Sequence, residues 1–85
     1  MNPKMIEAFR RWLMDSYGLQ ARSAGDVISR RNKLLTIVAD PTEMTMDQLR
    51  QTLNIQFTNG SFTQNTLRGM LRSEKLFREF NRLMQ

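Results

Sequence analysis

Cationic side chains recur at helical spacing in the last third of the chain, and they are the residues best suited to bind a ligand. On a helical wheel they fall within roughly 120° of one another. They are Arg68, Arg72, Lys75, Arg78 and Arg82. Only Glu79 interrupts this arc, whereas the outer face of a solvated helix usually mixes both signs of charge. A stripe of one sign favours binding to a phosphate backbone, and a solvated cationic face without a partner is the alternative.

A second cationic face is expected on the helix predicted from about Ser23 to Val38 or Ala39. Apolar residues recur there at helical spacing and form one arc, which we expect to be buried. The other side carries Arg22, Ser29, Arg30 and Lys33. Asp26 is the one acid on that side, so this face also favours an anionic partner.

Arg31 lies in the middle of the apolar arc of this second helix. A buried guanidinium requires a partner, so its side chain either extends to solvent along its aliphatic stem or pairs with a carboxylate. In the second case we expect a carboxylate such as Glu7 or Asp47. The pattern favours a structural role over contact with a ligand.

The composition limits the kind of protein this is. The chain has 85 residues and a formal net charge of +5. That length suits one modest hydrophobic core, so we expect a single helical domain over residues 1–85. The positive charge favours nucleic acid, an acidic protein surface or anionic lipid as a partner.

The residues needed for most catalytic chemistry are missing. The chain has no histidine and no cysteine, and its eight carboxylates form no close pair with a nucleophile. No glycine-rich loop follows a strand pattern. We therefore expect a binding module that is not an enzyme, with no catalytic residue, metal site, cofactor or small-molecule substrate. No apolar run approaches the roughly 20 residues of a membrane span, so a cytoplasmic protein without a membrane partner is expected.

Local signals predict four main helices. Asn2 and Pro3 begin the first, which extends to Tyr17 before Gly18. The second ends before Pro41. The expected fold class is therefore all-α, as a compact orthogonal bundle.

The third and fourth helices have clear N-terminal signals. Thr45 and Gln48 match a capping box, and the apolar stripe that follows extends to Phe57 or Thr58. Asn59-Gly60 is interpreted as a helix C-cap, although the same dipeptide favours a hairpin after a strand over Ile55–Phe57. Thr63 caps the fourth helix, which continues to near Met84.

Apolar residues from all four helices are expected to form one core. Trp12 could instead be a platform on which bases stack, but its spacing is typical of core aromatic residues. The predicted core residues are Phe9, Trp12, Leu13, Val27, Ile28, Leu49, Leu53, Leu67, Phe77 and Phe80.

The order of these motifs resembles the N-terminal core-binding domain of tyrosine recombinases and phage integrases, a SAM-like helical bundle. Three segments carry the resemblance, which covers nearly the whole chain. They are Phe9-Arg10-Arg11-Trp12-Leu13, Met44-Thr45 with Leu49, and Phe62-Thr63-Gln64-Asn65-Thr66-Leu67 with Leu71, Lys75, Leu76-Phe77 and Phe80.

The resemblance implies binding of duplex DNA by the second and fourth helices, in the setting of DNA recombination or integration and of phage or mobile elements. A DNA-bound protein of this kind would be associated with the nucleoid. The DNA-binding residues implied by position are Arg22, Ser29, Arg30, Lys33, Thr63, Gln64, Asn65, Arg68 and Arg72. The helical wheel adds Lys75.

This sequence also departs from the family pattern. Gln20 stands where serine usually caps the second helix, Gly25 weakens that helix, and Arg31 replaces an apolar residue. The catalytic cluster of arginine, histidine and tyrosine is missing, because Tyr17 is the only tyrosine and the chain has no histidine. The resemblance therefore implies DNA binding without cutting or joining.

A protein-interaction module is the other function that fits the sequence. Seven methionines suit an adaptable apolar interface, and the cationic faces would complement an acidic surface of a larger complex. The salt dependence of binding distinguishes the two hypotheses. Binding to several phosphates weakens steeply as the salt concentration rises, whereas binding through an apolar interface does not.

Overall fold

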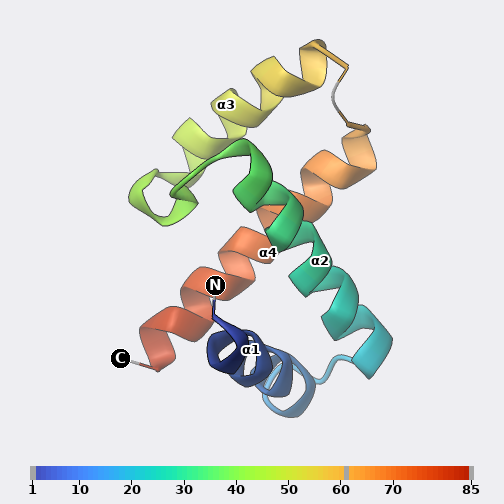
Figure 1. Ribbon diagram of the computed structural model, residues 1–85, viewed down its shortest axis with the longest axis vertical. Helices are drawn as coiled ribbons and strands as arrows, with labels where there is room; N and C mark the ends of the chain where they lie inside the picture. The colour runs from blue at the N-terminus through green and yellow to red at the C-terminus, as the bar shows by residue number, and fades with distance from the viewer. Residues whose placement is uncertain (1, 61, 85) are drawn as a thin grey trace.

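The computed structural model describes residues 2–60 and 62–84, and these form helices joined by short loops without any strand (Figure 1). The all-α class is thus confirmed. The helices in chain order are α1 (Pro3–Asp15), α2 (Ala21–Ile37), the 3-10 helix η1 (Pro41–Glu43), α3 (Met46–Thr58) and α4 (Gln64–Leu83).

The predicted starts of α1, α3 and α4 are confirmed by their hydrogen bonds. The Asn2 side chain accepts a bond of 2.8 Å from the Met5 amide at the start of α1. Thr45 and Gln48 form the complete capping box of α3, with each side chain accepting from the backbone N–H of the other residue. Thr63 accepts from the Thr66 amide at the start of α4. Each bond satisfies an amide that a helix start would otherwise leave without a partner.

Some predicted boundaries are wrong. Helix α1 ends at Asp15, because Gly18 adopts a φ of 79° and the Leu19 amide folds back to the Leu13 carbonyl. Tyr17 therefore lies beyond the helix and is 47% exposed. Helix α2 begins at Ala21, before the predicted Ser23, and ends at Ile37. The short helix η1 after Asp40 was not predicted.

The end of α3 settles the choice between a helix and a hairpin. Residues Ile55–Phe57 are helical, so the strand alternative is wrong. Asn59 caps the helix and Gly60 follows with a φ of 78°, the left-handed conformation that glycine adopts without strain.

Helices α2 and α4 cross at the centre of the molecule, with α1 at one end and α3 at the other (Figure 1). The pair α2 and α4 is in more extensive contact than any other pair of elements. Helix α1 packs against α2 and α4 at one end, and α3 packs against α4 at the other.

The apolar interior is divided into two clusters, so the expectation of a single core is wrong. The first cluster joins α1, α2 and the C-terminal half of α4 through Phe9, Leu13, Ala24, Val27, Ile28, Leu76, Phe77 and Phe80. The second joins α2, α3 and the N-terminal half of α4 through Leu34, Leu49, Leu53, Leu67 and Met70. Trp12 is only partly buried and packs against the first cluster, with its ring 5.8 Å from that of Phe80.

A buried ion pair joins α2 to α4 where these helices cross. Arg31 donates from Nε and Nη2 to the same oxygen of Glu74, over 3.1 and 3.0 Å. The two side chains are 5% and 0% exposed. The guanidinium carbon of Arg31 also lies 3.5 Å from the centre of the Phe77 ring, a cation–π contact.

The expected structural role of Arg31 is therefore supported, but the expected partners Glu7 and Asp47 are wrong. Glu74 projects from α4 into the interior, whereas Glu7 and Asp47 are exposed on α1 and α3. The crossing of α2 over α4 brings Arg31 to Glu74 and leaves the other two carboxylates at the surface.

Arg78 extends the same network to η1. Its Nε lies 3.6 Å from the second oxygen of Glu74, and its Nη2 donates to the carbonyls of Pro41 and Met44 over 2.6 and 2.5 Å. One turn of η1 is thereby held against α4. Arg78 thus has a structural role in the bundle.

We expect Arg31→Met to lower the free energy of unfolding by roughly 3–5 kcal/mol, because it leaves the buried Glu74 carboxylate without its closest cation. Adding Glu74→Leu should recover most of that loss, since a packed apolar pair often replaces a buried ion pair at little cost. Urea unfolding followed by circular dichroism measures both variants. A loss below about 1 kcal/mol for Arg31→Met would contradict this account of the helix crossing.

Candidate nucleic-acid interface

The outer faces of α2 and α4 form one continuous surface, because Arg30 lies across a glycine of α4. A Cβ atom built at Gly69 would lie 2.9 Å from Nε of Arg30 and 3.0 Å from its Cδ. Such contacts are closer than a real side chain tolerates. The absence of a side chain at Gly69 therefore allows the guanidinium of α2 to rest against the α4 backbone.

Two shallow hollows lie on this surface, and Arg30 lines both. The larger, of about 580 Å³, lies between α2 and the start of α4, and its lining includes Lys33 and Thr63. The smaller, of about 180 Å³, lies between the first half of α2 and the middle of α4, where it includes Arg72. Arg30 thus connects the two hollows into one surface.

The structure brings half of the predicted site residues together in these hollows. Those lining one or both are Ser29, Arg30, Lys33, Thr63 and Arg72. The others are exposed but line neither hollow: Arg22 on α2, and Gln64, Asn65, Arg68 and Lys75 on α4. Thr63 has a local role as well, since its hydroxyl caps α4.

The six predicted cations of the site are exposed, and none of them forms an ion pair within the described part of the chain. Among residues 2–60 and 62–84, the ion pairs are Arg31–Glu74, Arg78–Glu74 and Arg50–Asp47. None of these includes Arg22, Arg30, Lys33, Arg68, Arg72 or Lys75. Their charge is thus available to an anionic partner.

Sequence reasoning missed several residues of this surface. Asn32, Thr36, Phe62 and Thr66 line the larger hollow. Asn32 and Thr36 follow Ser29 at helical spacings of three and seven, so the wheel that selected Lys33 could have found them. Asp26 lines the smaller hollow near Arg30 and Arg72, which makes that end less favourable for an anion than the end at Lys33.

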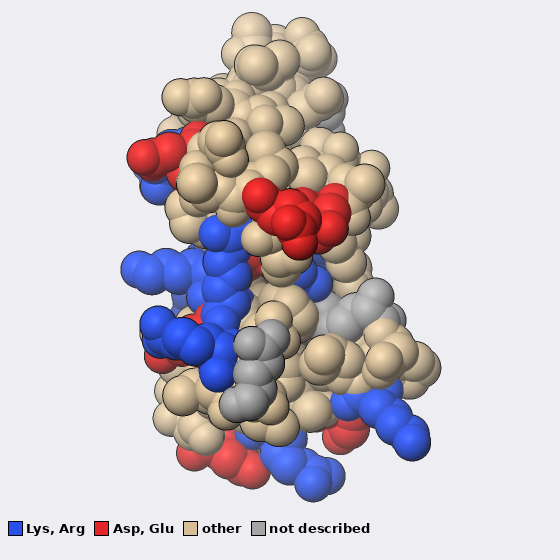
Figure 2. All heavy atoms as spheres, turned by 90° about the vertical axis from the view of Figure 1, so that its left-hand side faces the viewer, with Lys and Arg blue, Asp and Glu red and all other residues tan. Residues whose placement is uncertain are grey.

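The remaining cations of α4, Arg78 and Arg82, line neither hollow. Figure 2 shows the side that carries η1 and the C-terminal end of α4, where Lys and Arg atoms gather between groups of acidic atoms. Arg78 is bound to η1. Arg78 thus interrupts the one-sign arc seen on the wheel, whereas Arg68, Arg72, Lys75 and Arg82 form no ion pair in the described part of the chain.

The fold and this surface define an all-helical protein with a two-helix cationic face. Comparisons with protein-family models, curated proteins and solved structures found no match for the chain. In the described part of the chain, no helix is long and apolar enough to cross a bilayer. No group of three or more acidic side chains in that part is placed to hold a metal ion.

The two helical glycines provide a matched test of the contact between Arg30 and α4. Alanine in place of glycine inside a helix should add about 1 kcal/mol to the free energy of unfolding. Gly25→Ala should show this gain, because its new Cβ would lie 3.7 Å from Arg10, an ordinary contact. Gly69→Ala should raise the free energy of unfolding by less, because the new Cβ atom would displace the Arg30 side chain. Equal gains in thermal or urea unfolding would show that Arg30 does not rest on Gly69.

Proposed function

We propose that this protein binds duplex DNA through the outer faces of α2 and α4. The observation that carries the proposal is the set of six exposed cations on two adjacent helices, none of which pairs with a carboxylate in the described part of the chain. Bringing such cations against phosphates releases counterions from the DNA, and this supplies much of the affinity of DNA-binding proteins.

The geometry suggests different roles for the two ends of the surface. Arg30 and Lys33 lie on the larger hollow beside the start of α4, so they are suited to phosphate contacts. The partial positive charge of the α4 N-terminus acts in the same direction. Gln64 and Asn65 are exposed on the first turn of α4, and their amide groups suit the edges of bases.

The resemblance to recombinase core-binding domains leads to the same two helices. It therefore supports a role as a DNA-binding module in recombination or integration. The only tyrosine is Tyr17 and the chain has no histidine, so we expect DNA to be bound without being cut.

An acidic protein surface is the second candidate partner. The same unpaired cations would complement carboxylates, and Met14 exposes its thioether side chain at 38%. This alternative places part of the binding energy in apolar contacts, which salt weakens little. The salt dependence of binding therefore distinguishes it from DNA binding.

We expect Arg68→Ala and Arg72→Ala each to weaken binding to a short duplex by roughly 1–3 kcal/mol where the side chain contacts a base, or to reduce the salt slope by about one where it contacts phosphate. Lys33→Ala should weaken binding to all sequences alike, as expected for a phosphate contact. Fluorescence anisotropy at several salt concentrations measures both quantities.

Arg50→Ala is the matched control, because Arg50 is an exposed arginine on α3 whose side chain pairs with the exposed Asp47. It removes the same charge and should change binding little. Absence of binding by the wild-type protein at low salt would contradict the proposal. Equal effects of Arg50→Ala and Arg72→Ala would show that net charge, not this surface, determines binding.

A further inference from the structure

Charges of alternating sign follow one another along the outer face of α1. Lys4, Glu7, Arg11 and Asp15 are all exposed, and on a helical wheel they lie within roughly 80° of one another. Their spacings of three and four would allow ion pairs within the helix. None of these four side chains forms an ion pair in the described part of the chain. The stripe therefore presents two positive and two negative groups to the outside.

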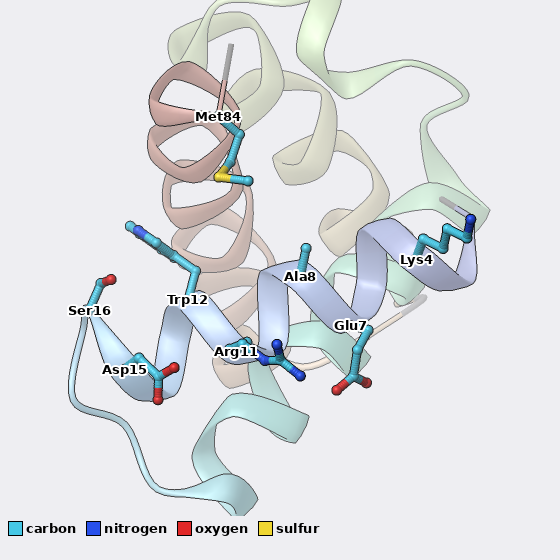
Figure 3. Close-up of a pocket in the computed structure, with 8 residues that line it drawn as sticks. All are labelled: Lys4, Glu7, Ala8, Arg11, Trp12, Asp15, Ser16 and Met84. Carbon is cyan, nitrogen blue, oxygen red and sulfur yellow. The ribbon is translucent and has the colours of Figure 1, made fainter.

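An apolar groove runs beside this stripe (Figure 3). It has a volume of about 520 Å³, and the four charged residues line it together with Ala8, Trp12 and Met84. Ala8 and Trp12 are partly buried on α1, whereas Met84 is contributed by the end of α4 and is 63% exposed. Figure 3 shows Met84 above α1, on the same side as the ring of Trp12. The short Ala8 side chain leaves room in the middle of the groove.

We infer that this face of α1 binds a second copy of the same chain, with the two α1 helices antiparallel about a two-fold axis. In that arrangement Lys4 of each copy lies opposite Asp15 of the other, and Glu7 of each lies opposite Arg11 of the other. When two copies of the helix run in opposite directions, each positive residue of one copy thus faces a negative residue of the other. Such a self-complementary patch is what a two-fold interface requires.

The axis of this arrangement passes between Glu7 and Arg11, close to Ala8. An alanine at that point lets two helices approach closely, and the apolar surfaces of Trp12 and Met84 flank the contact. Burial of apolar surface at the centre with charged groups at its edge is the usual composition of a protein interface. A parallel arrangement would instead place each charge beside an identical charge.

The sign pattern also argues against other occupants of this face. Its two cations and two carboxylates sum to no net charge, so neither a polyanion nor a uniformly acidic protein is favoured there. Tight binding of a second copy is not expected, because one helix face is small against the roughly 800 Å² that each partner buries in a typical stable complex. The inference is independent of the proposed binding of DNA.

Sedimentation velocity at low salt, up to roughly 1 mM protein, tests the inference, because weak association shows only at high concentration. The wild-type chain should shift from monomer toward dimer as its concentration rises. Glu7→Arg carries two cations at the central positions, and Arg11→Glu carries two carboxylates. Each single variant should therefore repel its own copy and sediment as a monomer at every concentration.

Mixing the two single variants should restore association, because each now complements the other. The double variant Glu7→Arg/Arg11→Glu should associate like the wild type, since it reverses both charges at once. Glu43→Arg and Arg50→Glu are the matched controls for charge, on η1 and α3, and should leave the dimer unchanged. Circular dichroism on each variant should give the helical spectrum of the wild type, because all exchanges are at exposed positions.

A wild-type chain that stays monomeric at roughly 1 mM would overturn the inference, since even a weak complex is populated at that concentration. Association that persists in both single variants would also overturn it, because the dimer would then use another face. Failure of the mixture to associate, with both variants folded, would exclude the antiparallel pairing of Glu7 with Arg11.

Discussion

The buried pair of Arg31 and Glu74 is the constraint on which the rest of the structure depends. Each charge lies in the interior, where an unpaired ion costs several kcal/mol. The two residues are 43 positions apart in the sequence, so only one crossing of α2 over α4 brings them together. Sliding either helix by one turn, about 5.4 Å, would separate the charges. The pair therefore fixes the register between the two central helices.

That register also determines the outer surface. The direction of the Arg30 side chain is set by that of Arg31, because neighbouring residues on a helix project about 100° apart. When Arg31 is held at Glu74, the preceding side chain, Arg30, lies across Gly69 and between the two hollows. The cationic face is thus a consequence of the buried pair. The same network reaches η1 through Arg78, whose bonds to the Pro41 and Met44 carbonyls hold the loop before α3.

The starts of α1, α3 and α4 could be predicted from the sequence because they depend on local bonds. Asn2, Thr45 and Thr63 each cap a helix through an amide three residues ahead. The partner of Arg31 could not be predicted in this way, since the choice among carboxylates depends on how the helices cross. One signal was available: Glu74, like Arg31, lies among apolar positions on its own helix, between Met70 and Phe77.

The division of the core into two clusters could not be predicted from the sequence, for a related reason. Helical spacing shows which face of a helix is buried but not which other helix covers it. Helices α2 and α4 are long enough to contribute to both clusters. Helical spacing also failed to show where α1 ends. Tyr17 continues the apolar spacing of α1, but the helix ends at Asp15 and Tyr17 is exposed.

The candidate site was predicted in part. The wheel selected Arg30, Lys33 and Arg72 correctly as exposed cations, and the structure brings them to one surface. It could not show that Arg78 is bound to η1, because that contact again spans distant parts of the chain. The wheel placed Asp26 on the same side of α2 as Arg30, but it could not show that Asp26 shares the smaller hollow with Arg72 of α4.

The central claim is that the face shared by α2 and α4 is the surface that meets DNA. Titration of the isotope-labelled protein with a short duplex, followed by amide chemical shifts, tests it most directly. The account predicts that the shifted amides cluster between residues 22 and 33 on α2 and between residues 63 and 75 around the first half of α4. Shifts concentrated on α1 or α3, or none at low salt, would contradict it.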